Sequence, residues 1–143
     1  MRALLDVNTL IALIDPSHAA FEKAHEWFGA HSGGVATCAI VQNGAARIIS
    51  QVNYAAKMRQ SVSAAIGIVR EFCEASDHQF WHQDVALVDE STFDDANLLG
   101  PKQITDAYLL AMAVRNSGVF VTFDAGIPVH AVRCAALKHL LVL

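Results

Sequence analysis

The feature that most constrains this fold is the alternation of short apolar segments with longer segments of helical periodicity. The apolar runs 2–6, 35–37, 119–123 and 140–143 are typical of buried strands, and 78–85 is an extended, aromatic-rich stretch. Helices are predicted between them at 9–14, 19–30, 39–51, 61–74 and 105–116. Such alternation predicts an α/β domain whose mostly parallel central sheet, of about four or five strands, is flanked by helices.

The last predicted helix has recognisable boundary signals. Thr105 is expected to cap its N-terminus and Gly118 to end it. These two residues therefore predict where the helix before the strand 119–123 begins and ends.

Length and composition favour one domain spanning residues 1–143. The chain is 54% hydrophobic and 17% charged, which excludes intrinsic disorder. Its longest uninterrupted apolar stretch, 107–114, is too short to cross a membrane. Asp6 and Asn8 interrupt the apolar N-terminus, so we interpret it as mature protein rather than a secretory signal.

Cysteine content and net charge bear on the cellular compartment and on binding to nucleic acid. The three cysteines, Cys38, Cys73 and Cys134, are widely spaced, which argues against a disulfide scaffold or a zinc knuckle and favours a reducing cytoplasm. The net charge of −4 repels nucleic acid. Any contact with nucleic acid is therefore expected to be local or assisted by a metal ion.

Three aspartates stand where functional groups gather in parallel sheets. Asp6 follows the first predicted strand and Asp124 follows the strand 119–123. Asp106 lies in the first turn of the helix 105–116, where the helix dipole favours an anion. The carboxyl ends of parallel strands share one edge of the sheet, so these three carboxylates are expected to meet there.

If they meet, something cationic must offset their repulsion, which is roughly 4 kcal/mol for two charges about 4 Å apart. Oxygen ligands alone favour Mg²⁺ or Mn²⁺ over zinc. An ion held this way can bind a phosphate oxygen and lower the pKa of a bound water, which is the chemistry of phosphodiester hydrolysis. Alternatively, each aspartate could simply end a strand or begin a helix.

Five segments, in this order along the chain, resemble the PIN-domain ribonuclease toxins of the VapC type, which belong to type II toxin–antitoxin pairs. They are LLDVNTLIALID, TCAIVQNGAARIIS, HQFWHQD, ITDAYLLAMAV and VTFDAGIP. The resemblance implies a Mg²⁺- or Mn²⁺-dependent endoribonuclease with Asp6, Asp106 and Asp124 at the metal site. It also implies products with 5′-phosphate and 3′-hydroxyl ends, a homodimer, and neutralisation by a small antitoxin protein.

The resemblance also identifies supporting positions and one departure. Asn8 and Thr122 match small polar residues that support the site in such proteins. Gln42 stands where the family usually has a glutamate. Its amide oxygen can still contact a metal ion through water, but the site loses one negative charge. Gln42 could instead be a polar residue on a solvated or dimer-facing helix surface.

Two rivals to the nuclease hypothesis remain. The first is a catalytically weakened PIN module that binds RNA or its antitoxin without efficient cleavage. The second is a phosphoryl-transfer enzyme with Asp6 as nucleophile, although DVNTL lacks the second aspartate that such phosphatases place two residues on. Isolated basic residues could contact RNA phosphate, or could simply be exposed: Arg47, Lys57, Arg59 and Lys102.

Overall fold

The computed structural model describes residues 1–54 and 60–143, so Lys57 and Arg59 lie outside the described residues. Its strands are β1 (Ala3–Leu5), β2 (Val35–Thr37), β3 (His78–Phe80), β4 (Val119–Thr122) and β5 (Leu140–Val142). Its α-helices are α1 (Val7–Ile14), α2 (Phe21–Ala30), α3 (Ala39–Ile49), α4 (Val62–Ala75) and α5 (Gln103–Arg115). Three short 3-10 helices are η1 (Asp95–Asn97), η2 (Val129–Ala131) and η3 (Leu137–His139).

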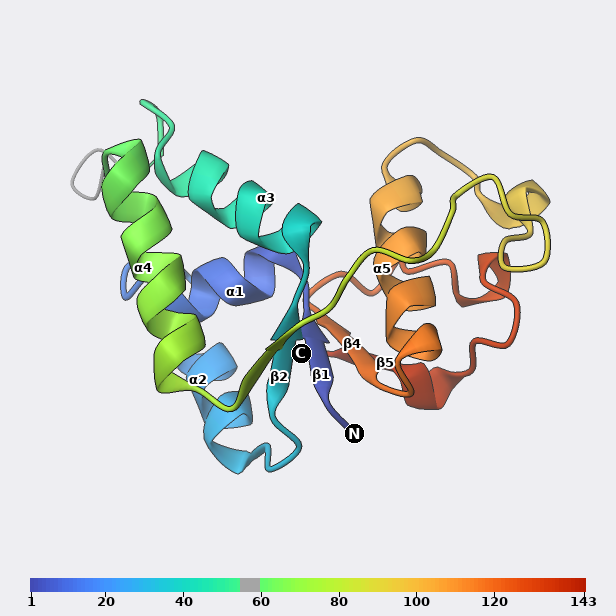
Figure 1. Ribbon diagram of the computed structural model, residues 1–143, viewed down its shortest axis with the longest axis horizontal. Helices are drawn as coiled ribbons and strands as arrows, with labels where there is room; N and C mark the ends of the chain where they lie inside the picture. Colours follow the sequence, from blue (N-terminus) through green and yellow to red (C-terminus); the bar gives the residue numbers. More distant parts are fainter. Residues whose placement is uncertain (55–59) are drawn as a thin grey trace.

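The five strands form one sheet in the order β3-β2-β1-β4-β5, and every neighbouring pair is parallel. Helices α1 to α4 lie on one side of the sheet, and α5 lies on the other with the segments around it (Figure 1). The predicted α/β class and parallel sheet are confirmed. Strands β1 and β2 are completely buried because helices cover both of their faces.

The predicted start of α5 at Thr105 is wrong, whereas the helix ends just before Gly118, as predicted. The helix begins at Gln103, two residues before Thr105. Its first turn is closed by the backbone N–H of Gln103, which donates to the Gly100 carbonyl at 3.1 Å, while the Gln103 side chain accepts from the Leu99 N–H at 2.9 Å. The turn that precedes the helix therefore starts it without a threonine cap.

At the other end of α5, the residue in the left-handed conformation is Ser117, with φ of 53°, and not Gly118. The N–H of Gly118 donates to the Ala113 carbonyl at 2.8 Å, which closes the helix end. Glycine is needed at 118 for space. A Cβ there would lie 2.5 Å from the Trp81 ring and 2.7 Å from the Arg2 carbonyl oxygen.

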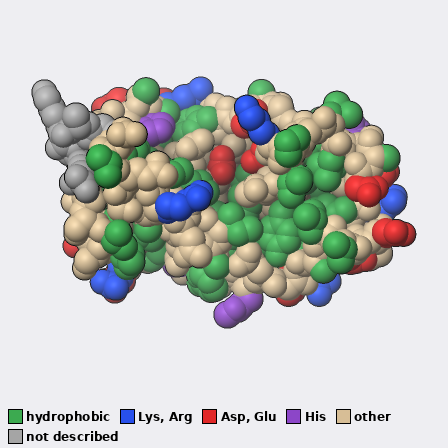
Figure 2. Space-filling model, turned by 90° about the horizontal axis from the view of Figure 1, so that it is seen from above, with side chains coloured by type: hydrophobic (Ala, Val, Ile, Leu, Met, Phe, Trp, Pro, Cys, Tyr) green, Lys and Arg blue, Asp and Glu red, His purple; other side chains and the backbone are tan. Residues whose placement is uncertain are grey.

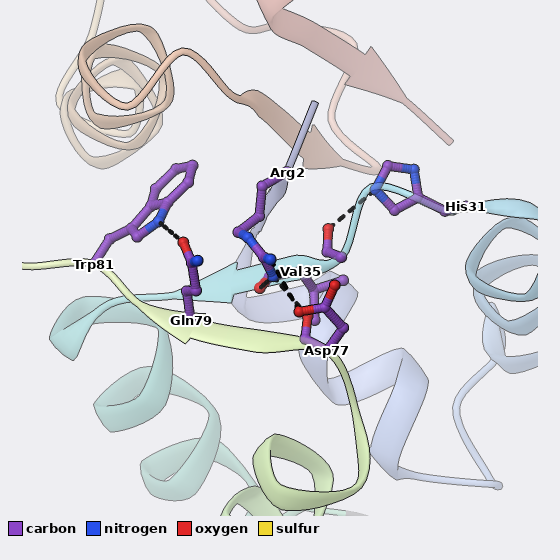
Figure 3. A network of polar contacts seen from close by, with 7 residues as sticks. Arg2, His31, Val35, Asp77, Gln79 and Trp81 are labelled. Carbon is purple, nitrogen blue, oxygen red and sulfur yellow. Dashed lines mark hydrogen bonds and ion pairs between the residues drawn. The ribbon is translucent and has the colours of Figure 1, made fainter.

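A polar network fixes the amino ends of the strands (Figure 3). The Arg2 guanidinium donates to the carbonyl oxygens of Val35 and Asp77 at 3.0 and 2.7 Å and pairs with the Asp77 carboxylate at 2.9 Å. It therefore links the start of β1 to β2 and to the turn before β3. The described helices include none long and apolar enough to span a membrane.

Candidate active site

The three aspartates predicted from the sequence lie at the carboxyl end of the sheet. Strands β1 and β4 are paired, with Leu5 opposite Val121, so the residues that follow them emerge at the same edge. Asp6 directly follows β1, and Asp124 comes two residues after β4 ends. Asp106 lies in the first turn of α5, which packs against both strands.

Thr122, which ends β4, connects two of these aspartates. Its fully buried hydroxyl donates to Oδ2 of Asp6 at 2.9 Å. The hydroxyl oxygen of Thr122 also accepts a hydrogen bond from the backbone N–H of Asp124 at 3.1 Å. One side chain therefore orients the Asp6 carboxylate and fixes the backbone where Asp124 begins the next loop.

Asp6 also caps helix α1. Its Oδ1 accepts from the Val7 N–H at 2.6 Å, so α1 begins two residues earlier than predicted. Burial raises the pKa of Asp6, and the charge of Asp124 raises it further, while the hydrogen bonds from Thr122 and Val7 oppose this shift. These hydrogen bonds stabilise the ionised carboxylate in a partly desolvated position.

Asp106 shows that the three carboxylates share one electrostatic environment. Burial and the negative charges of Asp6 and Asp124 together raise the pKa of Asp106 to about 6. Ionised Asp106 is therefore destabilised by its two neighbours, and a cation placed among the three would relieve that repulsion.

The donor chemistry fits a hard divalent cation such as Mg²⁺, which is bound by carboxylate oxygens and usually keeps several waters. Among the described residues, however, no group of three or more His, Cys, Asp or Glu side chains is arranged so that it could hold a metal ion as it stands. Local hydrogen bonds explain part of this, because Asp6 caps α1 and Oδ1 of Asp124 accepts from the Gly126 N–H at 2.6 Å. Waters or side-chain rotation would have to complete the ligand shell.

Gln42 lies on α3, beside β2. Its amide donates to the Thr37 hydroxyl at 2.9 Å and approaches the Cys73 sulfur at 3.9 Å. The same hydroxyl lies 2.8 Å from Nε2 of His78. The hydrogen bonds found for Gln42 thus go to this cluster, and Gln42 as an indirect metal contact stays a prediction.

Sequence reasoning missed Thr37, which is buried and joins the other members of that cluster. Its position at the end of β2 is the same signal that identified Asp6 and Asp124, but a threonine in an apolar run is not conspicuous. Asn8 is exposed on α1, and its supporting role also stays a prediction.

Figure 2 looks down on the face where the strands end. Acidic atoms lie near its centre with basic side chains close by on either side, and hydrophobic side chains gather over α5 and the segment before it. The centre of this face is therefore acidic and adjoins a more apolar region.

Comparisons with known proteins agree with this architecture. Residues 3–132 match the family model for the PIN domain. The chain is 46% identical to Ribonuclease VapC44 of Mycobacterium tuberculosis, with both chains fully covered. It is 38% identical to Ribonuclease VapC39 of the same species over 89% of this chain and 91% of the relative.

A solved structure supports the fold alone. The crystal structure of Mycobacterium tuberculosis VapC20, described as a Sarcin-Ricin loop cleaving toxin, aligns with a TM-score of 0.58 at 11% identity. The alignment covers 81% of this chain and 84% of that one.

Proposed function

Because this chain belongs to the PIN-domain family, we propose that it is a metal-dependent endoribonuclease and the toxin of a toxin–antitoxin pair. The observation that carries the proposal is the placement of three aspartates at one edge of the sheet, where Asp6 and Asp124 follow paired strands and Asp106 lies in the first turn of α5. The charges of Asp6 and Asp124 contribute to the raised pKa of Asp106. Three aspartates that repel one another at the end of a parallel sheet favour a divalent cation between them. The relatives' names, ribonucleases of the VapC type, support RNA as the substrate.

In this proposal, Asp6, Asp106 and Asp124 hold Mg²⁺ or Mn²⁺. Such an ion supplies positive charge at the scissile phosphate and lowers the pKa of a water molecule. The chain's own contribution is positioning. Thr122 keeps one oxygen of Asp6 fixed, the backbone of Gly126 does the same for Asp124, and α5 presents Asp106 from its first turn.

The wider setting follows from the same family. We propose that residues 1–143 form one domain, that the protein acts in the cytoplasm as a homodimer, and that a cognate antitoxin protein neutralises it. The relatives' VapC names support the antitoxin, because they match the toxin–antitoxin family that the sequence resembles. The wide spacing of Cys38, Cys73 and Cys134 in the sequence supports a reducing compartment.

The proposal is tested by incubating structured RNA with wild-type protein and with Asp6→Asn and Asp124→Asn, in Mg²⁺ or Mn²⁺ and in a chelator. We expect cleavage by wild type with metal, giving 5′-phosphate and 3′-hydroxyl ends, and at least a 100-fold loss, about 2.7 kcal/mol of barrier, in each variant. Glu71→Gln, which removes an exposed carboxylate from α4, is the matched control and should cleave normally. Equal cleavage by all four proteins would refute the proposal.

A second candidate is a PIN module that binds RNA or its antitoxin with little cleavage. Two observations favour it: residue 42 is a neutral amide that hydrogen bonds to Thr37, and the described carboxylates form no ready-made ligand group. Gln42→Glu separates the candidates. A gain in metal-dependent cleavage supports the weakened module, whereas unchanged, efficient cleavage supports the nuclease.

A further inference from the structure

The segment that connects β3 to α5 carries an exposed apolar surface that the candidate active site does not use. Val88 is 90% exposed and Leu99 is 89% exposed, the highest values among the large hydrophobic residues that the structure describes. A hollow of about 350 Å³ lies on this segment. Its lining, which we name the shelf, consists of Leu87, Val88, Asp89, Glu90, Phe93, Asp95, Leu98 and Ile104.

The floor of the shelf is firmly held. Phe93 is 4% exposed, stacks on Tyr108 of α5 with ring centroids 6.5 Å apart, and forms a backbone bridge with Val132. The Tyr108 hydroxyl donates to the Val85 carbonyl at 2.8 Å. Because buried anchors fix the segment, its outward apolar side chains are presented in a defined place instead of packing into the core.

The shelf is also strongly acidic. Residues 84–104 contain five of the chain's fourteen acidic residues but one of its ten basic residues, so the rest of the chain is formally neutral. Two of the five acids have ion-pair partners, Asp84 with Arg115 and Asp94 with Arg133. The three that line the hollow have none among the described residues.

The best-defined of these three is Asp89. Its carboxylate accepts hydrogen bonds from the Ser91 N–H, the Ser91 hydroxyl and the Thr92 hydroxyl at 2.7 to 2.9 Å. These bonds lower its pKa, so this edge of the shelf is negatively charged at neutral pH. An apolar hollow with a negative edge is complementary to a partner that presents apolar side chains beside basic ones.

We propose that the shelf binds a basic amphipathic segment of a partner protein, with aliphatic side chains in the hollow and Lys or Arg against Glu90 and Asp95. RNA fits poorly, because its phosphates would be repelled. A second copy of this chain also fits poorly. A two-fold contact would place the same acidic edge against itself. The proposal is independent of the nuclease activity, since none of the three aspartates of the candidate active site lines the shelf.

The test uses synthetic helical peptides of about 16 residues, long enough to form a helix. One presents leucines on one face and lysines on the other, a second replaces the lysines with glutamates, and a third keeps the lysines but replaces the leucines with serines. Fluorescence anisotropy measures their binding to the full chain. We expect the Leu/Lys peptide to bind at least ten times more tightly than either of the others, since both surface features are needed.

Variants locate the binding site. Leu87→Ser with Val88→Ser, which removes two exposed apolar side chains from the shelf, should weaken the Leu/Lys peptide at least tenfold. Leu137→Ser, at an exposed leucine on η3, should not change its affinity. Glu90→Lys with Asp95→Lys should reverse the preference so that the Leu/Glu peptide binds better. Circular dichroism checks that each variant is folded.

Three results would overturn the proposal. These are equal binding of the Leu/Lys and Leu/Glu peptides, unchanged affinity in both shelf variants, and loss of binding in Asp6→Asn with no loss in the shelf variants. The last result would mean that the peptide's lysines bind at the candidate active site. None of these outcomes depends on whether the chain cleaves RNA.

Discussion

Removing the charge of Asp106 should stabilise the metal-free protein at neutral pH. The pKa of this carboxyl is raised from 3.8 to about 6 in the folded chain. At 1.36 kcal/mol per pH unit, the full shift corresponds to about 3 kcal/mol. Because the side chain is partly exposed and screened by solvent, we reduce this to about 1 to 1.5 kcal/mol. For a chain of this size, that is a rise in Tm of about 3 to 5 °C for Asp106→Asn.

The pH dependence of stability shows in which pH range Asp106→Asn should stabilise the protein. A carboxyl whose pKa is higher in the folded than in the unfolded state binds more protons in the folded state. Its contribution to stability is therefore fully present below the unfolded pKa and is lost as pH rises through the folded pKa. The advantage of Asp106→Asn should therefore be clear at about pH 7.5 and small at about pH 4. Thermal unfolding of both proteins at both pH values, in a chelator, measures it.

Glu71→Gln controls for the loss of one negative charge and should give no comparable gain. Adding Mg²⁺ should raise the Tm of the wild type more than that of Asp106→Asn, since the ion relieves the same repulsion. An Asp106→Asn protein that is no more stable than wild type at about pH 7.5, or equally stabilised at both pH values, would refute the electrostatic reasoning.

Further predictions concern the site's support and the packing of two glycines. Thr122→Val should lower the free energy of unfolding by about 1 to 3 kcal/mol in urea, and Thr122→Ser should retain most of it, because the buried hydroxyl bonds to Asp6. Gly118→Ala should cost about 1 to 3 kcal/mol, because its methyl would overlap the Trp81 ring. Gly67→Ala should instead stabilise α4 by about 0.5 to 1 kcal/mol, because a methyl group there meets open space; a loss of stability would contradict this explanation.

Most of the fold could be predicted from the sequence because each element carries its own local signal. The apolar run 35–37 between Gly34 and a helical pattern is β2 as predicted, and Ser61 caps α4 through the N–H of Ala64 at 3.1 Å. The errors concern the starts of α1 and α5, where a side chain forms a hydrogen bond that the sequence pattern did not indicate. Asp6 starts α1 early, and Gln103 accepts from Leu99 to form the turn before α5.

The acidic part of the candidate site could be predicted because parallel topology alone brings strand ends to one edge. Asp6 and Asp124 emerge from paired strands in which Leu5 lies opposite Val121. The role of Thr122 needed only one further step, because it ends β4 immediately before that edge. The cluster around Thr37 could not be predicted, since it depends on how α3 and α4 pack over β2 and β3.

The Thr37 cluster gives Gln42 a physical role that a glutamate would not reproduce. The Thr37 hydroxyl has one hydrogen, and because it accepts from the Gln42 amide, that hydrogen is free to be donated to Nε2 of His78. Burial and the charge of Arg2 lower the pKa of His78, which favours the neutral ring that such a bond needs. A glutamate at 42 would take the hydroxyl's hydrogen, so His78 would have to supply a proton at Nε2 instead. Gln42→Glu therefore changes this chain of hydrogen bonds as well as the charge near the site. A gain in cleavage is assigned to the metal site only where it depends on the concentration of Mg²⁺ or Mn²⁺, and NMR of His78 measures the change in the cluster separately.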